Sequence, residues 1–352
     1  MNHSSTEILG SMTGAPDESL DVPPTSLVEL PALARLTGIG RVFAKLECER
    51  ALGNFKSLGG RVAGTRAIAR ATAAAAFPAK TSANPTSKQQ PIRLLCASDG
   101  NHGLAVAAAA RDGGATASVY LSTSVNGARA SRIEAVGGEI VWIQGTYDDA
   151  VRAAEQAAAS GAGILVSDTS TDPDDIGLLD VMDGYRILAN ELRAQFAEDF
   201  NTAPTHLFVQ AGVGGLAAAM AQGLHDVMSG PRKMLVVEPE KAACVARALA
   251  EGRVAPVSGD LHTAAEMLSC GLASAHALRV LKRFDVQSVL LMESELIDAV
   301  SVLRDAGAPE TTPSGAAGFA GLLHAANNPA LRAVCQLDDE SRALFVITEG
   351  PL

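Results

Sequence analysis

From residue 92 onward, short apolar runs alternate with longer, alanine-rich stretches that have the pattern of helices. The apolar runs cover residues 92–97, 117–121, 139–143 and 164–166, and then 206–210, 234–238, 288–292 and 343–347. A glycine or a polar break follows each run. Strands that alternate with helices in this way form parallel sheets with helices on both faces. The sequence therefore predicts an α/β fold with open, mostly parallel twisted sheets.

The order of these runs indicates two sheets. A long helix, expected over residues 180–200, separates the first four strands from the last four. At 352 residues the chain has room for two domains. Two blocks are therefore plausible, one with the strands before about residue 167 and one with the strands after about residue 205.

Composition narrows the class of function. The net charge of −11 argues against nucleic-acid binding, which needs a basic surface, and against a polybasic membrane anchor. The five cysteines are scattered and form no CxxC pair, so we predict neither a metal site nor a disulfide framework. The polar composition of residues 1–22 predicts a flexible arm without an apolar signal region. The composition of residues 78–91 predicts a surface excursion, that is, a loop outside the folded core. No apolar run has membrane-spanning length, so we expect a cytoplasmic protein with a small-molecule ligand.

One lysine lies between glycines, in the stretch Gly53-Asn54-Phe55-Lys56-Ser57-Leu58-Gly59-Gly60. A lysine that bonds covalently to a carbonyl compound needs a desolvated, deprotonable amine. Glycines let a flat ring approach the backbone closely. By itself, however, the stretch favours an ordinary surface lysine in a glycine-rich turn, so the other loops decide.

In α/β sheets, ligands bind at the carboxyl ends of the strands, and a polar loop follows the strand that ends at residue 97. Its sequence is Ser98-Asp99-Gly100-Asn101-His102-Gly103. The backbone N–H groups and the Ser98 hydroxyl can hold a carboxylate at a helix N-terminus. Asn101 offers both a donor and an acceptor. A helix start capped by Ser98 or Asp99 explains the loop equally well.

A second loop carries three glycines between a strand and an alanine-rich helix, in the order Gln210-Ala211-Gly212-Val213-Gly214-Gly215-Leu216. Free N–H groups and the positive end of a helix favour an anion there. The spacing matches neither a dinucleotide fingerprint nor a P-loop. A single phosphate group is therefore favoured over a nucleotide, and a tight strand-to-helix turn is the structural alternative.

Two more strands end in polar residues. Asp168 closes the strand at residues 164–166, where a lone aspartate is usually a turn or cap residue. Thr348 closes the last strand, where its hydroxyl can meet a ring nitrogen or simply mark the end of the strand.

Taken together, Lys56, the one-phosphate loop and the asparagine-bearing loop resemble the fold-type II, or tryptophan-synthase-β-like, family of pyridoxal-phosphate enzymes. The resemblance runs in the right order from about Pro24 to Gly350. Within that family the chain is most similar to the diaminopropionate ammonia-lyases, which carry Asp where serine and threonine dehydratases carry a small residue at the position of Asp99. Asp168 resembles their second catalytic aspartate.

The resemblance implies a large domain from residues 23–60 and 180–352 and a smaller, mobile domain from residues 61–179. It also implies pyridoxal 5'-phosphate as the cofactor, in the cleft between these domains. Lys56 would hold it covalently next to Phe55, Asn101 would bond its ring hydroxyl, and Thr348 would lie by its pyridine nitrogen. The phosphate would be held by Gly212, Val213, Gly214, Gly215 and Leu216. The substrate would be held by Ser98, Asp99, Gly100, Asn101, His102 and Asp168.

The implied reaction is the α,β-elimination of ammonia from 2,3-diaminopropionate, giving pyruvate and ammonia. Lys56, Asp99 and Asp168 would be catalytic, with any of the three as the base, and His102 has the character of a structural residue. A carboxylate also suits a substrate with a second, cationic amine. The resemblance further implies a homodimer, and we expect no metal, no nucleic acid and no membrane partner.

The sequence departs from the ammonia-lyase pattern around the substrate. Leu104 replaces an expected arginine, Pro313 replaces an expected glutamate, and no aromatic segment follows Asp168. The chain also ends at Leu352, without the expected tail. These departures leave other reactions open: a serine, threonine or 3-hydroxy-amino-acid dehydratase first, then a β-replacement synthase, an inactive or regulatory homologue, and a nucleotide-binding module.

Overall fold

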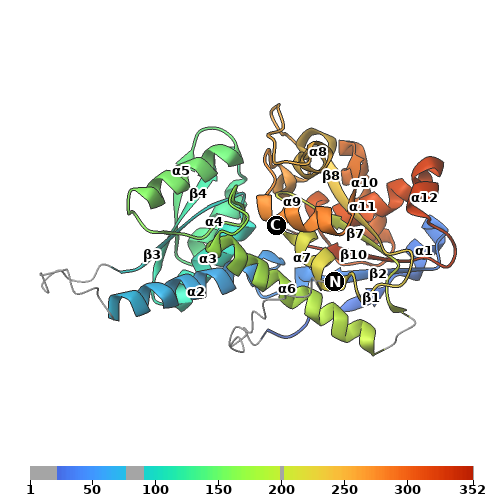
Figure 1. Ribbon diagram of the computed structural model, residues 1–352, viewed down its shortest axis with the longest axis horizontal. Helices are drawn as coiled ribbons and strands as arrows, with labels where there is room; N and C mark the ends of the chain where they lie inside the picture. Colours follow the sequence, from blue (N-terminus) through green and yellow to red (C-terminus); the bar gives the residue numbers. More distant parts are fainter. Residues whose placement is uncertain (1–21, 77–90, 199–201, 352) are drawn as a thin grey trace, which may run out of the picture.

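The computed structural model describes residues 22–76, 91–198 and 202–351. The predicted N-terminal arm, apart from residue 22, and the predicted surface excursion, apart from residue 91, lie outside the described residues. Figure 1 shows two α/β units side by side, one built around β3 and β4 and the other around β2, β7, β8 and β10. Helix α2 lies beneath the unit of β3 and β4, and α6 runs from there to beneath the other unit.

The larger sheet has six strands in the order β1-β2-β10-β7-β8-β9. The strands are β1 (Leu27–Glu29), β2 (Arg41–Leu46), β7 (His206–Gln210), β8 (Lys233–Pro239), β9 (Gln287–Leu291) and β10 (Arg342–Ile347). All neighbours pair in parallel except β1 and β2, which pair antiparallel. The short edge strand β1 was not predicted from the sequence.

The smaller sheet has four strands in the order β5-β4-β3-β6, all parallel. The strands are β3 (Arg93–Ser98), β4 (Thr116–Ser122), β5 (Gly138–Ile143) and β6 (Ile164–Leu165). The prediction of an α/β fold with two mostly parallel sheets is confirmed. All strands of the smaller sheet come from residues 61–179 and all strands of the larger one from residues 23–60 and 180–352. The domain boundaries and the mobility of the smaller domain stay predictions.

Helices cover both sheets (Figure 1). They are α1 (Pro31–Thr37), α2 (Lys56–Ala76), α3 (Asn101–Asp112), α4 (Gly127–Ala135), α5 (Tyr147–Ala159), α6 (Ile176–Ala197), α7 (Gly215–Leu224), α8 (Cys244–Glu251), α9 (Ala275–Arg283), α10 (Glu293–Asp305), α11 (Pro313–Asn327) and α12 (Pro329–Cys335). The long helix begins at Ile176 rather than at residue 180, because the Asp175 side chain caps it by accepting a hydrogen bond from the N–H of Leu178.

Glycines on α2 let three helices approach closely. A Cβ atom on Gly60 would lie 2.5 Å from the Cβ of Ala105 on α3, and one on Gly59 would lie 2.5 Å from the Tyr185 ring on α6. These glycines therefore serve helix packing, rather than the access of a ring to the backbone that the sequence suggested. This packing places Lys56, the first residue of α2, at a fixed position between the two sheets.

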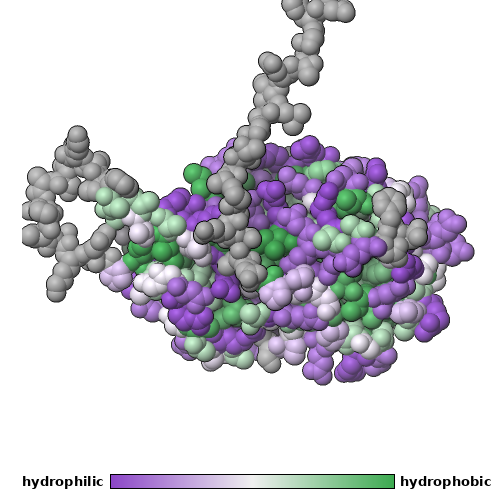
Figure 2. Space-filling view, turned by 90° about the horizontal axis from the view of Figure 1, so that it is seen from below, coloured by the Kyte–Doolittle hydropathy of each residue, from purple (hydrophilic) through white to green (hydrophobic). Residues whose placement is uncertain are grey.

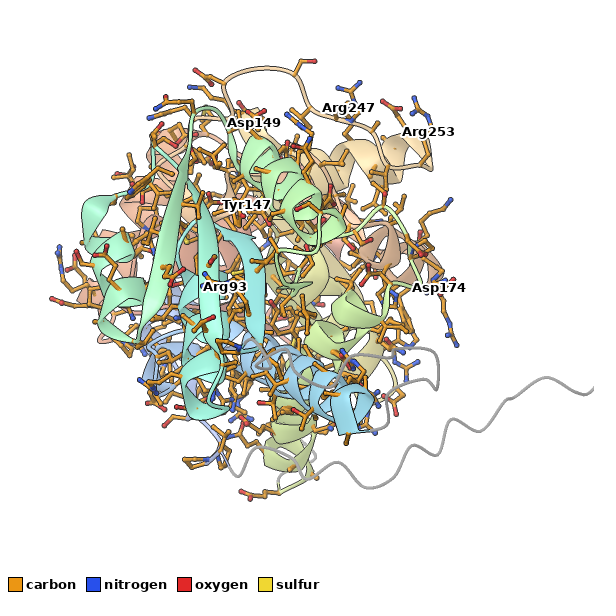
Figure 3. All side chains as sticks on the ribbon, turned by 90° about the vertical axis from the view of Figure 1, so that its left-hand side faces the viewer. Arg93, Tyr147, Asp149, Asp174, Arg247 and Arg253 are labelled. Atoms are coloured by element: carbon orange, nitrogen blue, oxygen red, sulfur yellow. The ribbon has the colours of Figure 1, made fainter. Side chains whose placement is uncertain are left out.

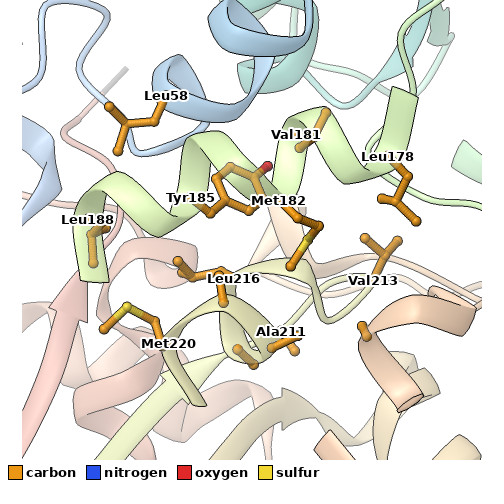
Figure 4. Packing of buried hydrophobic residues seen from close by; sticks show 14 of the residues in the cluster. Leu58, Leu178, Val181, Met182, Tyr185, Leu188, Ala211, Val213, Leu216 and Met220 are labelled. Carbon is orange, nitrogen blue, oxygen red and sulfur yellow. The ribbon is translucent and has the colours of Figure 1, made fainter. Parts of the chain in front are cut away.

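Helix α6 lies between α2 and α7, and its buried face holds the two units together. Figure 4 shows Leu58 of α2 on one side of α6 and Leu216 and Met220 of α7 on the other. These residues belong to one cluster of buried apolar side chains that includes strands of both sheets. The face seen in Figure 2, from below the view of Figure 1, is largely hydrophilic with scattered apolar residues.

The described residues can be searched for disulfide bonds, metal-ligand groups and membrane-spanning helices. The five cysteines are free thiols, and four of them are buried. Within residues 22–76, 91–198 and 202–351, no group of three or more His, Cys, Asp or Glu side chains is arranged to hold a metal ion. No helix in this part of the chain is both long and apolar enough to cross a membrane.

Candidate active site

A cavity lies between the two sheets, at the carboxyl ends of their strands. The loops after β3 and β6 line it from the smaller sheet, and the loops after β2, β7 and β10 line it from the larger one. The sequence-predicted residues that line it are Phe55, Lys56, Ser98, Asp99, Asn101, His102, Asp168, Gly212, Val213, Gly214, Gly215, Leu216 and Thr348. Gly100 is the one predicted residue that does not line it. Residues that follow different strands, far apart in the sequence, thus lie around one cavity, as expected where ligands bind at the carboxyl ends of strands.

Lys56 and Asp168 form an ion pair across the two units. The ammonium of Lys56 donates a hydrogen bond to Oδ2 of Asp168, and the Tyr147 hydroxyl donates one to Oδ1 at 2.9 Å. Figure 3 shows Tyr147 inside the molecule, whereas Asp174 and Arg253 project from its edge. The Asp168 side chain is 3% exposed, so its charge depends on these partners.

This arrangement sets the charges of both groups. Burial alone would raise the pKa of Asp168, but the nearby charges of Lys56 and His102 and the hydrogen bonds from Lys56 and Tyr147 hold that pKa well below its usual range. Burial would likewise lower the pKa of Lys56, but the Asp168 carboxylate outweighs it and raises that pKa. The sequence led us to expect a deprotonable amine. The structure instead holds Lys56 as an ammonium, because Asp168 lies next to it.

Asp99 has the opposite environment. Burial raises the pKa of Asp99 to about 7, the positive charge of Lys56 lowers it in part, and the negative charge of Asp168 adds to the increase. Two aspartates in one cavity are therefore held in different protonation states near neutral pH. Pairs of carboxyl groups with separated pKa values divide the roles of acid and base in many enzymes.

The glycine-rich loop after β7 presents unused donors. Across the described residues, no acceptor is found for the backbone N–H groups of residues 212–216. Helix α7 begins at Gly215 without a side-chain cap, so its positive end faces the same space. Gly214 has φ +94, and a Cβ atom there would lie 3.0 Å from the Cβ of Ala277. Orphaned donors in a glycine loop, with Lys56 in the same cavity, fit the phosphate and aldehyde groups of pyridoxal phosphate.

Thr348 lies at the end of β10 and lines the cavity. The amide nitrogen of Gln210 lies 3.1 Å from its hydroxyl oxygen, so this hydroxyl can accept from Gln210 and donate its own proton to a ligand. Gln210 is buried, and its side-chain oxygen has no partner within the described part of the chain. Gln210 was named in the sequence only as part of the loop, because its side-chain contacts depend on β10.

The sequence suggested that the loop after β3 either binds a ligand or caps a helix, and it has features of both. The Ser98 hydroxyl accepts hydrogen bonds from the N–H groups of Gly100 and Gly103, both at 2.8 Å, so Ser98 acts as a cap for the start of α3. His102 is buried, and its Nε2 lies 2.9 Å from the carbonyl oxygen of Val166. This contact supports a structural role for His102. Asp99 and Asn101 line the cavity.

Sequence analysis missed several residues of this site. Glu349 lines the cavity beside Thr348, and its carboxylate accepts hydrogen bonds from Asn101 and from Arg129. Tyr147 and Tyr185 also line the cavity, and the Tyr185 ring packs 5.1 Å from that of Phe55. Glu349 was visible as a polar residue after a strand. The others lie inside helices, where the sequence pattern carries no sign of a site.

Comparisons with known proteins agree with this geometry. The family model described as "Pyridoxal-phosphate dependent enzyme" matches residues 18–349. The diaminopropionate ammonia-lyase of Salmonella typhimurium is 31% identical over 346 residues, which cover 93% of this chain and 85% of the relative. The L-serine dehydratase/L-threonine deaminase of Mus musculus is 24% identical and covers 93% of this chain and 88% of the relative.

Solved structures give the same result. The crystal structure of holo diaminopropionate ammonia lyase from Escherichia coli superposes with a TM-score of 0.81 at 28% identity, covering 93% of this chain and 84% of that one. A structure of the same enzyme in complex with D-serine superposes with a TM-score of 0.80 and covers 93% and 85% of the two chains. From the match over residues 18–349 and the cavity with its lysine and glycine loop, we conclude that this chain belongs to the pyridoxal-phosphate-dependent enzymes.

Proposed function

We propose that this protein eliminates ammonia from 2,3-diaminopropionate. Overall, one diaminopropionate and one water give one pyruvate and two ammonia. The observation that carries the proposal is the pair Asp99 and Asp168, which line one cavity with Lys56 and differ in protonation state near neutral pH. A cationic second amine on the substrate matches these carboxylates. The similarity to diaminopropionate ammonia-lyases supports the same substrate.

The residues of the cavity suit distinct tasks. Lys56 would hold the cofactor, the N–H groups of residues 212–216 its phosphate, and Thr348 its ring nitrogen. The bound cofactor supplies an electron sink that acidifies the α-carbon of an amino acid. Asp99, with a pKa of about 7, is the group best able to accept and return a proton near neutral pH.

Asp168 suits a different task. It stays ionised over the physiological range, because Lys56 and Tyr147 hold its carboxylate. An ionised carboxylate that is already hydrogen-bonded is a weak base but a good partner for an ammonium group. We therefore assign Asp168 to the charge of Lys56 and of the second amine of the substrate, and Asp99 to the proton on the α-carbon.

A dehydratase of serine, threonine or another 3-hydroxy amino acid is the second candidate. A hydroxide leaving group needs a proton, and Asp99 can supply one because about half of it is protonated near pH 7. The relationship to the mouse dehydratase and the D-serine complex of the E. coli enzyme also favour this reading. In the dehydratase reading Asp99 is an acid, and in the ammonia-lyase reading it is a base.

A substrate screen distinguishes the two. The purified holoenzyme should release pyruvate from D- or L-diaminopropionate at least about tenfold faster, in kcat/KM, than from serine, with threonine and 3-hydroxyaspartate as further substrates. The Lys56→Ala variant should lose both the visible absorption of covalently bound cofactor and turnover. A holoenzyme that turns over serine or threonine fastest would contradict the ammonia-lyase proposal.

The assembly and location expected from the sequence belong to the same proposal. The family resemblance supports a homodimer, and the acidic net charge of −11 is compatible with the cytoplasm. Light scattering of the purified protein tests the first expectation, and fractionation of cells that express it tests the second. A monomer with full activity would contradict the homodimer.

A further inference from the structure

Glu349 is a buried carboxylate at the edge of the cavity. It follows Thr348 at the end of β10, and only 3% of its surface is exposed. Burying a carboxylate is costly unless charged or hydrogen-bonding partners compensate. Its partners therefore indicate what this residue does.

The donors to Glu349 come from both units. Asn101, at the start of α3, donates its side-chain N–H to Oε2. Arg129, on α4, places its two terminal nitrogens 3.3 Å from the two carboxylate oxygens. Thr312, just before α11, donates its hydroxyl to Oε1. Asn101 and Arg129 belong to the unit of the smaller sheet, whereas Glu349 and Thr312 belong to that of the larger one.

Arg129 is held tightly in this arrangement. It is 3% exposed, and its Nε also lies 3.4 Å from Glu266 of the larger unit. Its aliphatic stem packs on Gly100, where a Cβ atom would lie 2.9 Å from Cδ of the arginine and where φ is +140. Gly100, which does not line the cavity, therefore makes room for Arg129 directly before Asn101.

The contact with Glu349 determines which way the Asn101 amide faces. An ionised carboxylate only accepts hydrogen bonds, so Asn101 must turn its nitrogen, and not its oxygen, toward Glu349. The same nitrogen carries a second N–H. With one N–H bound to Glu349, the second is held in one orientation at the cavity wall.

We infer that Glu349 is a positioning residue that orients Asn101 toward the cofactor, and that Arg129 ties this orientation to the contact between the two units. The inference rests on the proposed use of pyridoxal phosphate and not on the identity of the amino-acid substrate. Glu349→Gln keeps the shape of the side chain but removes its charge. The Asn101 amide can then face either way.

The test uses cofactor affinity as well as activity. Apo-protein is titrated with pyridoxal phosphate, and its dissociation constant and the absorption maximum of the bound form are measured. Glu349→Gln should raise the dissociation constant by about tenfold or more, on the scale of a hydrogen bond to a charged group, and shift the absorption maximum. An unchanged constant and an unchanged maximum would overturn the inference.

Glu47→Gln is the matched control. Glu47 is also fully buried and paired with an arginine, Arg50, at 2.8 Å, but it does not line the cavity. The Glu47→Gln variant should have lower thermal stability than the wild type. Its dissociation constant for pyridoxal phosphate should stay within about twofold of the wild-type value, since affinity depends on contacts at the site. If Glu47→Gln weakened cofactor binding as much as Glu349→Gln does, general destabilisation would explain both effects, and the inference would be overturned.

A double-mutant cycle tests whether Glu349 acts through Asn101. In an Asn101→Ala background, Glu349→Gln should change the dissociation constant by less than about twofold. An undiminished effect would show that Glu349 acts by another route. If Glu349→Gln does not fold, Arg129→Lys replaces it, because lysine keeps the charge but not the two-point contact. An unchanged affinity in Arg129→Lys would then overturn the role of Arg129.

The proposed function can fail separately. A wild-type protein that binds pyridoxal phosphate at Lys56 but releases no pyruvate from diaminopropionate would overturn the ammonia-lyase reading alone. The titrations of Glu349→Gln, Glu47→Gln and the Asn101→Ala background would still decide whether Glu349 positions Asn101.

Discussion

Lys56 and Asp168, which are 112 residues apart in the sequence, form an ion pair in the cavity between the two sheets. Lys56 begins α2, after β2 of the larger sheet, and Asp168 follows β6 of the smaller one. The pair therefore bridges the two units at the site where the cofactor is expected to bind. Four predictions follow from this cavity and a fifth from the packing that supports it.

The ion pair should stabilise the apo-protein over a wide pH range. The pKa of Asp168 is lowered in the folded state, so its contribution is present above the ordinary pKa of about 4 and is lost as the pH falls further. The pKa of Lys56 is raised, so its contribution is present below about 10 and is lost at higher pH. Asp168→Asn should cost about 3 kcal/mol at pH 7, at the lower end for a buried pair because the Lys56 side chain is 21% exposed.

Urea denaturation at pH 7 and pH 3 measures this effect. The difference in unfolding free energy between wild type and Asp168→Asn should shrink at pH 3. At that pH the side chain of residue 168 is largely neutral in the unfolded state of both proteins. A difference that stays constant between these pH values would mean that the pair does not act through its charge.

Asp99 should give the opposite pH dependence. Its pKa is raised to about 7, so the folded apo-protein loses stability as the pH rises from the ordinary aspartate value of about 4 to about 7. Asp99→Asn removes this loss. The variant should be more stable than wild type at pH 8 and similar to it at pH 4 in the same denaturation experiment. A variant that is less stable at pH 8 would contradict a raised pKa.

Asp99 should also separate the two candidate reactions. If it removes the α-proton of diaminopropionate, Asp99→Ala should lower kcat/KM for this substrate by about 100-fold or more, on the scale of lost acid–base catalysis. It should lower serine turnover much less if Lys56, and not Asp99, removes the α-proton of serine. Equal losses with both substrates would mean that Asp99 removes the α-proton of both and does not distinguish them.

Tyr147 should act through Asp168. Tyr147→Phe removes one hydrogen bond at 2.9 Å without changing the shape of the ring. A hydrogen bond to a charged group contributes about 1.5–3 kcal/mol, so kcat should fall by about tenfold or more. Tyr120→Phe, on β4 and outside the cavity, serves as the control in steady-state assays. An equal fall in kcat in the two variants would exclude a specific role for Tyr147.

The glycines of α2 should be essential for the position of Lys56. Gly60→Val would force a side chain into Ala105, whose Cβ lies 2.5 Å from the position of the new Cβ atom. Overpacking of this kind costs about 1–3 kcal/mol. Gly127→Ala on α4, where a Cβ atom meets nothing within 4 Å, should be neutral or slightly stabilising. Thermal denaturation of both variants checks the contrast, and equal melting temperatures would contradict close packing of α2 on α3.

Some elements could be predicted because their information is local. Each of the eight strands predicted from residue 92 onward is found with its ends within one residue, because a buried parallel strand is a continuous apolar run bounded by glycine or polar residues. Edge strand β1 was missed, because a strand of three residues is too short to show such a run. The start of α6 was misplaced by four residues, because Asp175 was not recognised as its cap.

For the site, the sequence by itself determined which residues can do chemistry. The candidate residues all follow strands: Lys56, Asp99, Asn101, Asp168 and the glycine loop. In an α/β fold the carboxyl ends of the strands meet at one edge of the sheet, which brings such residues together. Their charges were decided only by the tertiary structure. Lys56, for which the sequence suggested a deprotonable amine, is an ammonium because Asp168 lies beside it. Asp99 has a raised pKa because it is buried near the Asp168 carboxylate.

The same distinction holds for Tyr147, Arg129 and Glu349. Tyr147 and Arg129 lie in ordinary amphipathic helices, and the contacts that give them a role in the cavity are made with residues 21 and 220 positions away. A sequence pattern records the residue types and the periodicity of each element. Protonation states and hydrogen-bond partners depend on distances between elements, and these exist only once the two sheets have packed against each other.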